Sequence, residues 1–123
     1  MESLFRCPLC QRALDRQENR YLCPQGHSFD RAAAGYVHLL PANKMHSKDP
    51  GDDKGMATAR REFLSKGYYV PLLNTLCTEI SARTGNSPAL LDTGCGEGYY
   101  TAGVYRALLD AGKAPRMAHA EAV

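Results

Sequence analysis

The chain has 123 residues, which is enough for one ordinary domain or two very small ones. Its net charge of +2 forces no strongly charged partner, and a hydrophobic content of 44% is typical of folded proteins. No apolar run approaches the ~20 residues that span a bilayer, and the N-terminus lacks the apolar region of a signal peptide. Five cysteines, an odd number, fit a reducing compartment better than a disulfide scaffold. We therefore expect a cytoplasmic protein with no membrane partner.

Two pairs of metal-ligand residues occupy two short turns near the N-terminus. Two residues separate Cys7 from Cys10, and three separate Cys23 from His27. These spacings let both donors of a turn face one ion, and a structural Zn²⁺ takes four such ligands in a tetrahedron. We therefore predict that all four side chains bind zinc. Two disulfides, or free buried cysteines, are the alternatives.

The segment around these ligands is expected to be a zinc ribbon, in a domain that covers residues 1–40. Residues 21–22 and 28–29 flank the second turn and should form paired strands. Residues 35–40 predict one more short strand, which Pro41 ends. So small a unit has almost no hydrophobic core, so we expect the metal to supply most of its stability.

A polar segment at 41–55 predicts a linker, in which Lys44, His46 and Lys48 either contact phosphate or are simply solvated. Residues 56–65 then have helical spacing, with Arg60 and Arg61 opposite the apolar face and the same two alternatives open. A second helix follows, with Pro71 in its first turn. The expected buried positions of the two helices are Met56, Ala59, Phe63 and Leu64 in the first, and Leu73, Leu76, Cys77 and Ile80 in the second.

Residues 88–92 predict a short buried parallel strand that leads directly into a glycine-rich loop. The loop contains Gly94, Gly96 and Gly98, and a helix with an apolar face at Tyr100, Val104, Ala107 and Leu108 follows it. Strand, glycine loop and helix in this order are typical of a nucleotide-type cofactor site. The pattern lacks the GxGxxG spacing and the Lys-Ser/Thr of a phosphate loop. Leu-Asp-Thr-Gly-Cys-Gly-Glu-Gly at 91–98 instead resembles the first motif of class I S-adenosylmethionine-dependent methyltransferases. A dinucleotide site and a purely structural glycine turn are the alternatives.

Zinc ribbon and loop together resemble a more specific family, the zinc-containing 23S rRNA guanine-N1 methyltransferases. The resemblance rests on Cys-Pro-Leu-Cys at 7–10, Tyr-Leu-Cys-Pro-Gln-Gly-His-Ser-Phe-Asp at 21–30, Gly-Tyr-Val-His-Leu-Leu-Pro at 35–41, Asp-Pro-Gly-Asp at 49–52, Ala-Arg-Arg-Glu-Phe-Leu at 59–64 and Leu-Asp-Thr-Gly-Cys-Gly-Glu-Gly-Tyr-Tyr-Thr at 91–101. It covers about residues 4–117.

The resemblance implies an α/β fold: a zinc ribbon, two linking helices, and the first β–α portion of a Rossmann-like methyltransferase domain at 56–123. It implies zinc at Cys7, Cys10, Cys23 and His27, and S-adenosylmethionine at Tyr69, Asp92, Gly94, Gly96 and Glu97. It also implies a 23S rRNA hairpin as the substrate recognised by the ribbon, and a homodimer. It assigns no catalytic base.

In that family the chain would continue after residue 117 with a strand that ends on an acidic residue for the cofactor ribose, which Glu121 imitates poorly. Only 31 residues follow Asp92. We therefore expect a truncated or frameshifted copy, or a fragment, with weak or absent cofactor binding and no methyl transfer alone. Leu90, Leu91, Val104 and Leu108 should then lose much of their burial. The alternative function is a non-catalytic zinc-ribbon module that binds RNA or a protein partner.

Overall fold

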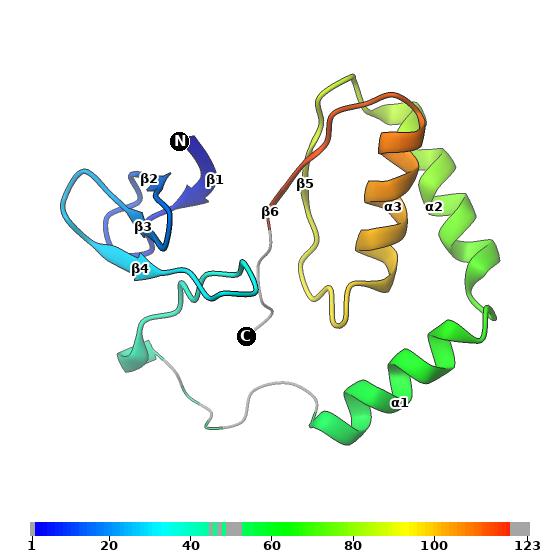
Figure 1. The fold of residues 1–123 in the computed structure, drawn as a ribbon, viewed down its shortest axis with the longest axis horizontal. Helices are drawn as coiled ribbons and strands as arrows, with labels where there is room; N and C mark the ends of the chain where they lie inside the picture. Colours follow the sequence, from blue (N-terminus) through cyan, green and yellow to red (C-terminus); the bar gives the residue numbers. More distant parts are fainter. Residues whose placement is uncertain (1, 45, 47, 49–52, 119–123) are drawn as a thin grey trace.

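The computed structural model describes residues 2–44, 46, 48 and 53–118. Its first part is a small antiparallel sheet, drawn blue to cyan in Figure 1, and its second part contains the long helices, drawn green to red. Among the described residues, no helix is long and apolar enough to cross a membrane. The division of the chain at residues 40 and 55 stays a prediction.

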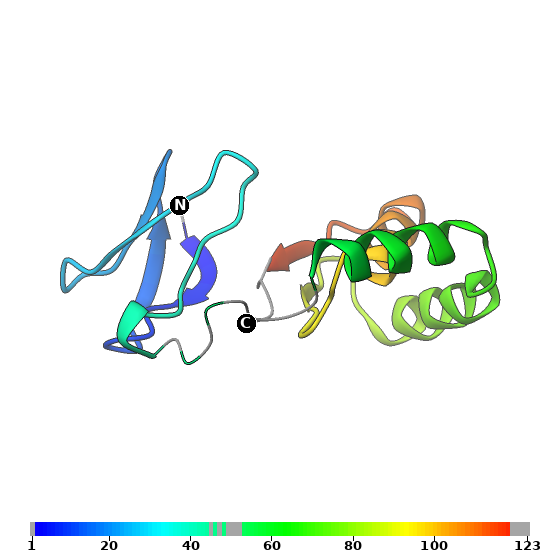
Figure 2. The ribbon, with the colours of Figure 1, turned by 90° about the horizontal axis from the view of Figure 1, so that it is seen from below.

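The N-terminal sheet contains four strands in sequence order. They are β1 (Glu2–Arg6), β2 (Ala13–Arg16), β3 (Arg20–Leu22) and β4 (Ser28–Asp30). Tyr21 pairs with Phe29 and Leu22 with Ser28, which confirms the strands predicted on either side of the second turn. Each ligand pair lies at or just beyond a turn between two neighbouring strands, so the sheet brings the two turns together (Figure 2 shows this sheet from a second direction).

The core of the sheet consists of five buried residues, two of which are predicted zinc ligands. They are Cys7, Leu14, Tyr21, Cys23 and Val37. The ring of Phe5 packs edge-on against that of Tyr21, with centroids 5.5 Å apart. So small a core is consistent with the expectation that a metal stabilises the unit.

The strand predicted at residues 35–40 is wrong. The structure has a turn there, in which the Gly35 N–H donates to the Ala32 carbonyl at 2.8 Å. Gly35 takes a φ of +101°, which a strand does not allow. Only an isolated bridge between Arg31 and Val37 remains of the pairing. The apolar alternation of this segment reflects a buried Val37 and not a ladder of hydrogen bonds.

The linker and the helices follow. A single 3₁₀ turn covers Ala42–Lys44. Helix α1 spans Lys54–Ser65 and helix α2 spans Val70–Arg83. The Asp53 side chain accepts a 2.8 Å hydrogen bond from the Met56 N–H, which starts α1 two residues before the predicted 56. Pro71 lies in the first turn of α2, as predicted.

The predicted apolar face of α1 is mostly not buried. Leu64 is buried, but Met56 is 54% and Phe63 46% exposed, and Ala59 is also exposed. The helix therefore has little apolar packing, although its periodicity is regular. The predicted stripe of α2, by contrast, is half-buried at all four positions, and this helix packs against helix α3.

The last three elements form one β–α–β unit. Strand β5 (Ala89–Leu91) leads through the glycine loop into helix α3 (Tyr99–Asp110), and strand β6 (Arg116–Ala118) pairs with β5 in parallel. The parallel strand before the loop is thus confirmed. One such unit is the repeat of an α/β sheet, and a Rossmann-like domain around it stays a prediction.

The burial of this unit matches the expectations only in part. Leu91 is 64% exposed, so β5 is not the buried strand that its apolar sequence predicted, whereas the loss of burial expected at Leu91 is confirmed. Val104 and Leu108, expected to lose their burial, are 7% and 1% exposed. Both residues lie on α3, the helix that packs against α2. Glu121 lies outside the described residues.

Candidate metal centre and glycine loop

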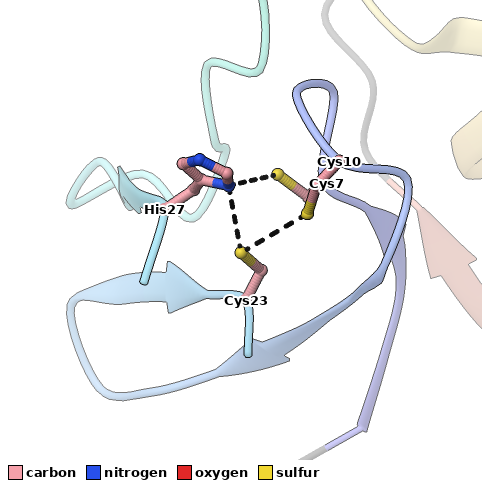
Figure 3. A group of neighbouring side chains, drawn as sticks. All are labelled: Cys7, Cys10, Cys23 and His27. Carbon is pink, nitrogen blue, oxygen red and sulfur yellow. Dashed lines mark hydrogen bonds between the residues drawn. The ribbon is translucent and has the colours of Figure 1, made fainter. Parts of the chain in front are cut away.

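Four side chains converge where the two turns of the N-terminal sheet meet (Figure 3). One donor atom each from Cys7, Cys10, Cys23 and His27 lies within 4.8 Å of every other. The structure therefore brings together all four predicted zinc ligands, from turns that are separated by β2 and β3 in the chain. Cys7 and Cys23 are buried, and the other two side chains are half-buried.

The separations between the donor atoms fit a tetrahedral ion better than disulfides. Cys10 Sγ lies 3.7 Å from Cys23 Sγ, and His27 Nδ1 lies 3.5 Å from Cys7 Sγ and 3.3 Å from Cys23 Sγ. Bond lengths of ~2.3 Å to sulfur and ~2.1 Å to nitrogen give tetrahedral edges of ~3.8 Å between sulfurs and ~3.6 Å between sulfur and nitrogen. A disulfide needs ~2.05 Å between sulfurs, and all five cysteines are free.

In both turns a backbone N–H donates to the carbonyl of the first cysteine. In the first, the Gln11 N–H donates to the Cys7 carbonyl at 2.8 Å, and in the second the Gly26 N–H donates to the Cys23 carbonyl at 2.9 Å. Each turn contains one residue with positive φ, +62° at Gln11 and +84° at Gly26. Glycine makes the second predictable from sequence. Nothing in the sequence marks Gln11 for this role.

The surroundings of the cluster favour a thiolate at one position. Burial raises the pKa of the Cys23 thiol, but hydrogen bonds from the backbone N–H groups of His27 and Gln25, together with the Cys10 and His27 side chains, lower that pKa to about 7. At Cys10 a hydrogen bond with the backbone of Arg12 lowers the pKa of the thiol. Burial and the sulfurs of Cys7 and Cys23 raise it, and together they outweigh the Arg12 bond, so the pKa of Cys10 is raised. A thiolate is the form that binds a metal ion. The donor set therefore fits Zn²⁺ in chemistry as well as in distance.

The glycine loop lies between the strand β5 and the helix α3, in the order that its sequence predicted. Gly94, Gly96 and Gly98 have φ values of +74°, +57° and +85°, which other residues rarely adopt. A side chain added at Gly94 or Gly98 would meet no atom within 4 Å. The loop therefore presents open backbone to a ligand.

Two carboxylates border this loop. Asp92, at the end of β5, accepts a hydrogen bond from Thr101 Oγ1 in the first turn of α3. Glu97, inside the loop, pairs with Arg61 of α1, whose Nε lies 3.2 Å from Oε2. Sequence reasoning missed both partners. Thr101 lay within the recognised motif without a role, and the pairing of Arg61 is a contact between segments 36 residues apart.

Tyr69 is the remaining predicted cofactor residue. It immediately precedes α2, is 42% exposed, and its ring packs edge-on against Phe63 at 5.8 Å. Burial raises the pKa of Tyr100, and the neighbouring hydroxyls of Tyr69 and Tyr99 raise it further. Tyr69 therefore interacts electrostatically with Tyr100, which lies in the first turn of α3.

Two open grooves among the described residues lie apart from this loop. One, of about 360 Å³, crosses β2 and β3 and includes Cys23 in its wall. The other, of about 410 Å³, runs between α2 and α3 beside Gly103. Neither contains Tyr69, Asp92 or a residue of the glycine loop.

Comparison with known families decides the nature of the first unit. Residues 5–48 match the family described as RlmA, N-terminal, whose model is a zinc ribbon. This range contains all four residues of the cluster. Residues 5–48 are an RlmA-type zinc ribbon.

Three relatives carry the similarity beyond the ribbon. A 23S rRNA (guanine(748)-N(1))-methyltransferase of Streptomyces fradiae is 34% identical over 109 residues, which cover 87% of this chain and 38% of that protein. Two relatives provisionally named 23S rRNA (guanine-N(1)-)-methyltransferases are 45% identical over 78 residues in Micromonospora griseorubida and 33% identical over 103 residues in Bacillus subtilis. These two matches cover 60% and 78% of this chain, and 25% and 34% of the relatives.

The chain is thus homologous, over much of its length, to proteins named as 23S rRNA guanine-N1 methyltransferases. It spans between a quarter and two fifths of the length of these relatives. Their names indicate a methyltransferase family. The RlmA-type zinc ribbon and the names of the relatives agree with the family that the sequence motifs resemble.

Proposed function

We propose that this chain provides the rRNA-recognition and cofactor-loop parts of a 23S rRNA guanine-N1 methyltransferase. In this proposal the RlmA-type zinc ribbon holds one structural zinc ion and contacts an rRNA hairpin. The β5–loop–α3 segment belongs to a Rossmann-like domain and holds S-adenosylmethionine. The observation that carries the proposal is the glycine loop itself, with three positive φ values and carboxylates at Asp92 and Glu97, in a chain homologous to methyltransferases.

The residues present fit the methionine end of the cofactor. Open backbone at Gly94 and Gly98 leaves room for a ligand to approach the N–H groups of the loop. Glu97 offers a carboxylate to a cationic amino group, and Thr101 fixes the carboxylate of Asp92 at the end of β5. In this proposal the exposed ring of Tyr69 adds an aromatic wall.

The cofactor, when bound, supplies an activated methyl group on a sulfonium. The role of the chain is to hold and orient one end of that cofactor, because methyl transfer depends mainly on alignment. The ring nitrogen of guanine must also lose a proton, and we assign no residue of this chain to that step. A homodimer is part of the same proposal, by analogy with the family.

A titration monitored by amide NMR tests the cofactor site. S-adenosylmethionine should shift the amide signals of residues 92–101, with weak affinity because this loop holds only one end of the ligand. Gly96→Val should abolish these shifts, since valine does not adopt the φ of +57° found at Gly96.

Gly85→Val is the matched control, because Gly85 lies outside the loop and an added side chain there meets no atom within 4 Å. Its titration should resemble that of the unchanged chain. Shifts that persist in Gly96→Val, or none in the unchanged chain, would reject the cofactor site and favour a zinc-ribbon module without catalysis.

A further inference from the structure

The ion pair between α1 and the glycine loop is unequal in its exposure. The side chain of Glu97 is 12% exposed, whereas that of Arg61 is 70% exposed. A largely buried carboxylate needs a positive partner, because burial without one costs several kcal/mol. Arg61 supplies that charge through a single contact, in which its Nε lies 3.2 Å from Glu97 Oε2. It does not form the bidentate pair that an arginine can form with a carboxylate.

Helix α1 depends on its arginines at this point. Its apolar side chains Met56 and Phe63 are about half exposed, so apolar packing holds the helix only weakly. The Arg60 guanidinium lies close to the loop as well, 3.9 Å from the position of a side chain added at Gly96. Both arginines therefore lie at the glycine loop, and Arg61 is the one that pairs with Glu97.

We propose that Arg61 is a displaceable counter-ion, which occupies the place on Glu97 that the amino group of the cofactor takes when it binds. The inference rests on the proposed function and adds a regulatory step to the same site. Two cations at one carboxylate repel each other. Arg61 is held by one contact and is exposed to solvent, so it is the cation that leaves Glu97.

The consequence is a coupling between the cofactor loop and α1. When the cofactor's amino group binds Glu97, Arg61 is released and α1 loosens from the loop. The released guanidinium then faces solvent on a helix that also carries Arg60, and it is available to a phosphodiester of the RNA substrate. Because Arg61 and the cofactor compete for Glu97, whatever weakens the Arg61–Glu97 pair should strengthen cofactor binding, by at most the factor by which the pair is weakened.

Removing the charge of Arg61 tests the inference. In the complete chain, Arg61→Gln should bind S-adenosylmethionine about two- to fivefold more tightly at low salt, the range expected for a partly exposed ion pair. The matched probe is S-adenosyl-4-methylthio-2-oxobutanoate, in which a keto group replaces the amino group of the methionine part while the sulfonium and carboxylate stay, and its affinity should not change. Lys54→Gln, which removes one positive charge from the first residue of the same helix, should bind both probes as the unchanged chain does.

Amide hydrogen exchange gives a second readout that needs no affinity measurement. Without ligand, Arg61→Gln should speed exchange in residues 54–65, and S-adenosylmethionine should produce the same change in the unchanged chain. Tighter binding confined to the ligand that has the methionine amino group, together with faster exchange, supports the inference.

Other outcomes separate the inference from the proposed function. Equal or weaker S-adenosylmethionine binding by Arg61→Gln would overturn the counter-ion role of Arg61. The proposed function would still stand in that case, provided that S-adenosylmethionine binds to the glycine loop of the unchanged chain. No binding of S-adenosylmethionine by any variant would overturn the proposed function and the inference together.

Discussion

Lys113 is a single side chain that closes the end of α2. Its Nζ donates to the carbonyls of Ser81 and Thr84 at 2.5 and 2.6 Å, and lies 3.2 Å from Thr84 Oγ1. The last carbonyls of a helix have no partner within the helix, and a lysine near them also complements the helix dipole. Because Lys113 follows α3, one residue joins the ends of two helices.

We predict that Lys113→Met destabilises the helical part of the chain by about 1–2 kcal/mol, because two carbonyls lose charged hydrogen bonds while the length of the side chain is kept. Urea unfolding followed by circular dichroism at 222 nm measures this change. Lys66→Met is the control, since Lys66 is an exposed residue at the end of α1. Equal stability of the two variants would show that the lysine contacts contribute little.

At the scale of elements, the contact between α2 and α3 organises the second half of the chain. It depends on a glycine in the middle of α3. A side chain added at Gly103 would lie 2.6 and 2.7 Å from the two δ-carbons of Leu73 and 3.1 Å from its γ-carbon. The two helices therefore approach closely at this point, and Val104 and Leu108 are buried beside it.

Gly103→Leu should separate α2 from α3 and lower the free energy of unfolding by about 1–3 kcal/mol, the usual cost of an overpacked contact. Thermal unfolding measures the effect. Ala102→Leu is a close control, because residue 102 is exposed on the same helix. Leucine is a good helix former at either position, so a similar stability for both variants would contradict the close packing.

At the scale of the whole molecule, the metal centre and the helical unit depend on different forces. The ribbon has five buried core residues, two of them predicted zinc ligands, whereas α2 and α3 pack through their own apolar side chains. Loss of the metal should therefore affect the two parts of the chain differently.

We predict that Cys10→Ser loses the zinc, about one ion per chain, and unfolds the ribbon, because a structural zinc contributes ~10–16 kcal/mol of binding energy. Metal analysis and hydrogen exchange should show protection lost in residues 2–40 and kept in α2 and α3. Cys77→Ser, on α2 and outside the cluster, should keep the metal. A ribbon that stays folded without metal would refute the prediction. If α2 also lost its protection from exchange, the claim that the ribbon and the helical unit are stabilised independently would be refuted.

The sequence alone was enough to predict the local features of this protein. The ligand spacings at 7–10 and 23–27 predicted a cluster that the structure assembles, and the glycines at 94, 96 and 98 predicted the loop that the structure has between a strand and a helix. Both follow from short-range chemistry, since donor spacing and glycine conformation depend on residues only a few positions apart. Strands β3 and β4, helix α2 and the parallel strand β5 were predictable for the same reason.

The contacts between segments far apart in the chain were decided only by the tertiary structure. The apolar pattern at 35–40 resembled a strand, but no neighbouring strand forms a ladder with it, and a turn at Gly35 results. The apolar face of α1 is regular and yet mostly exposed, because periodicity does not specify a packing partner. Arg61 and Glu97 were predicted to have separate roles, and the fold pairs them. Burial, register and ion pairing between segments far apart in the chain are collective properties, so only the folded arrangement determines them.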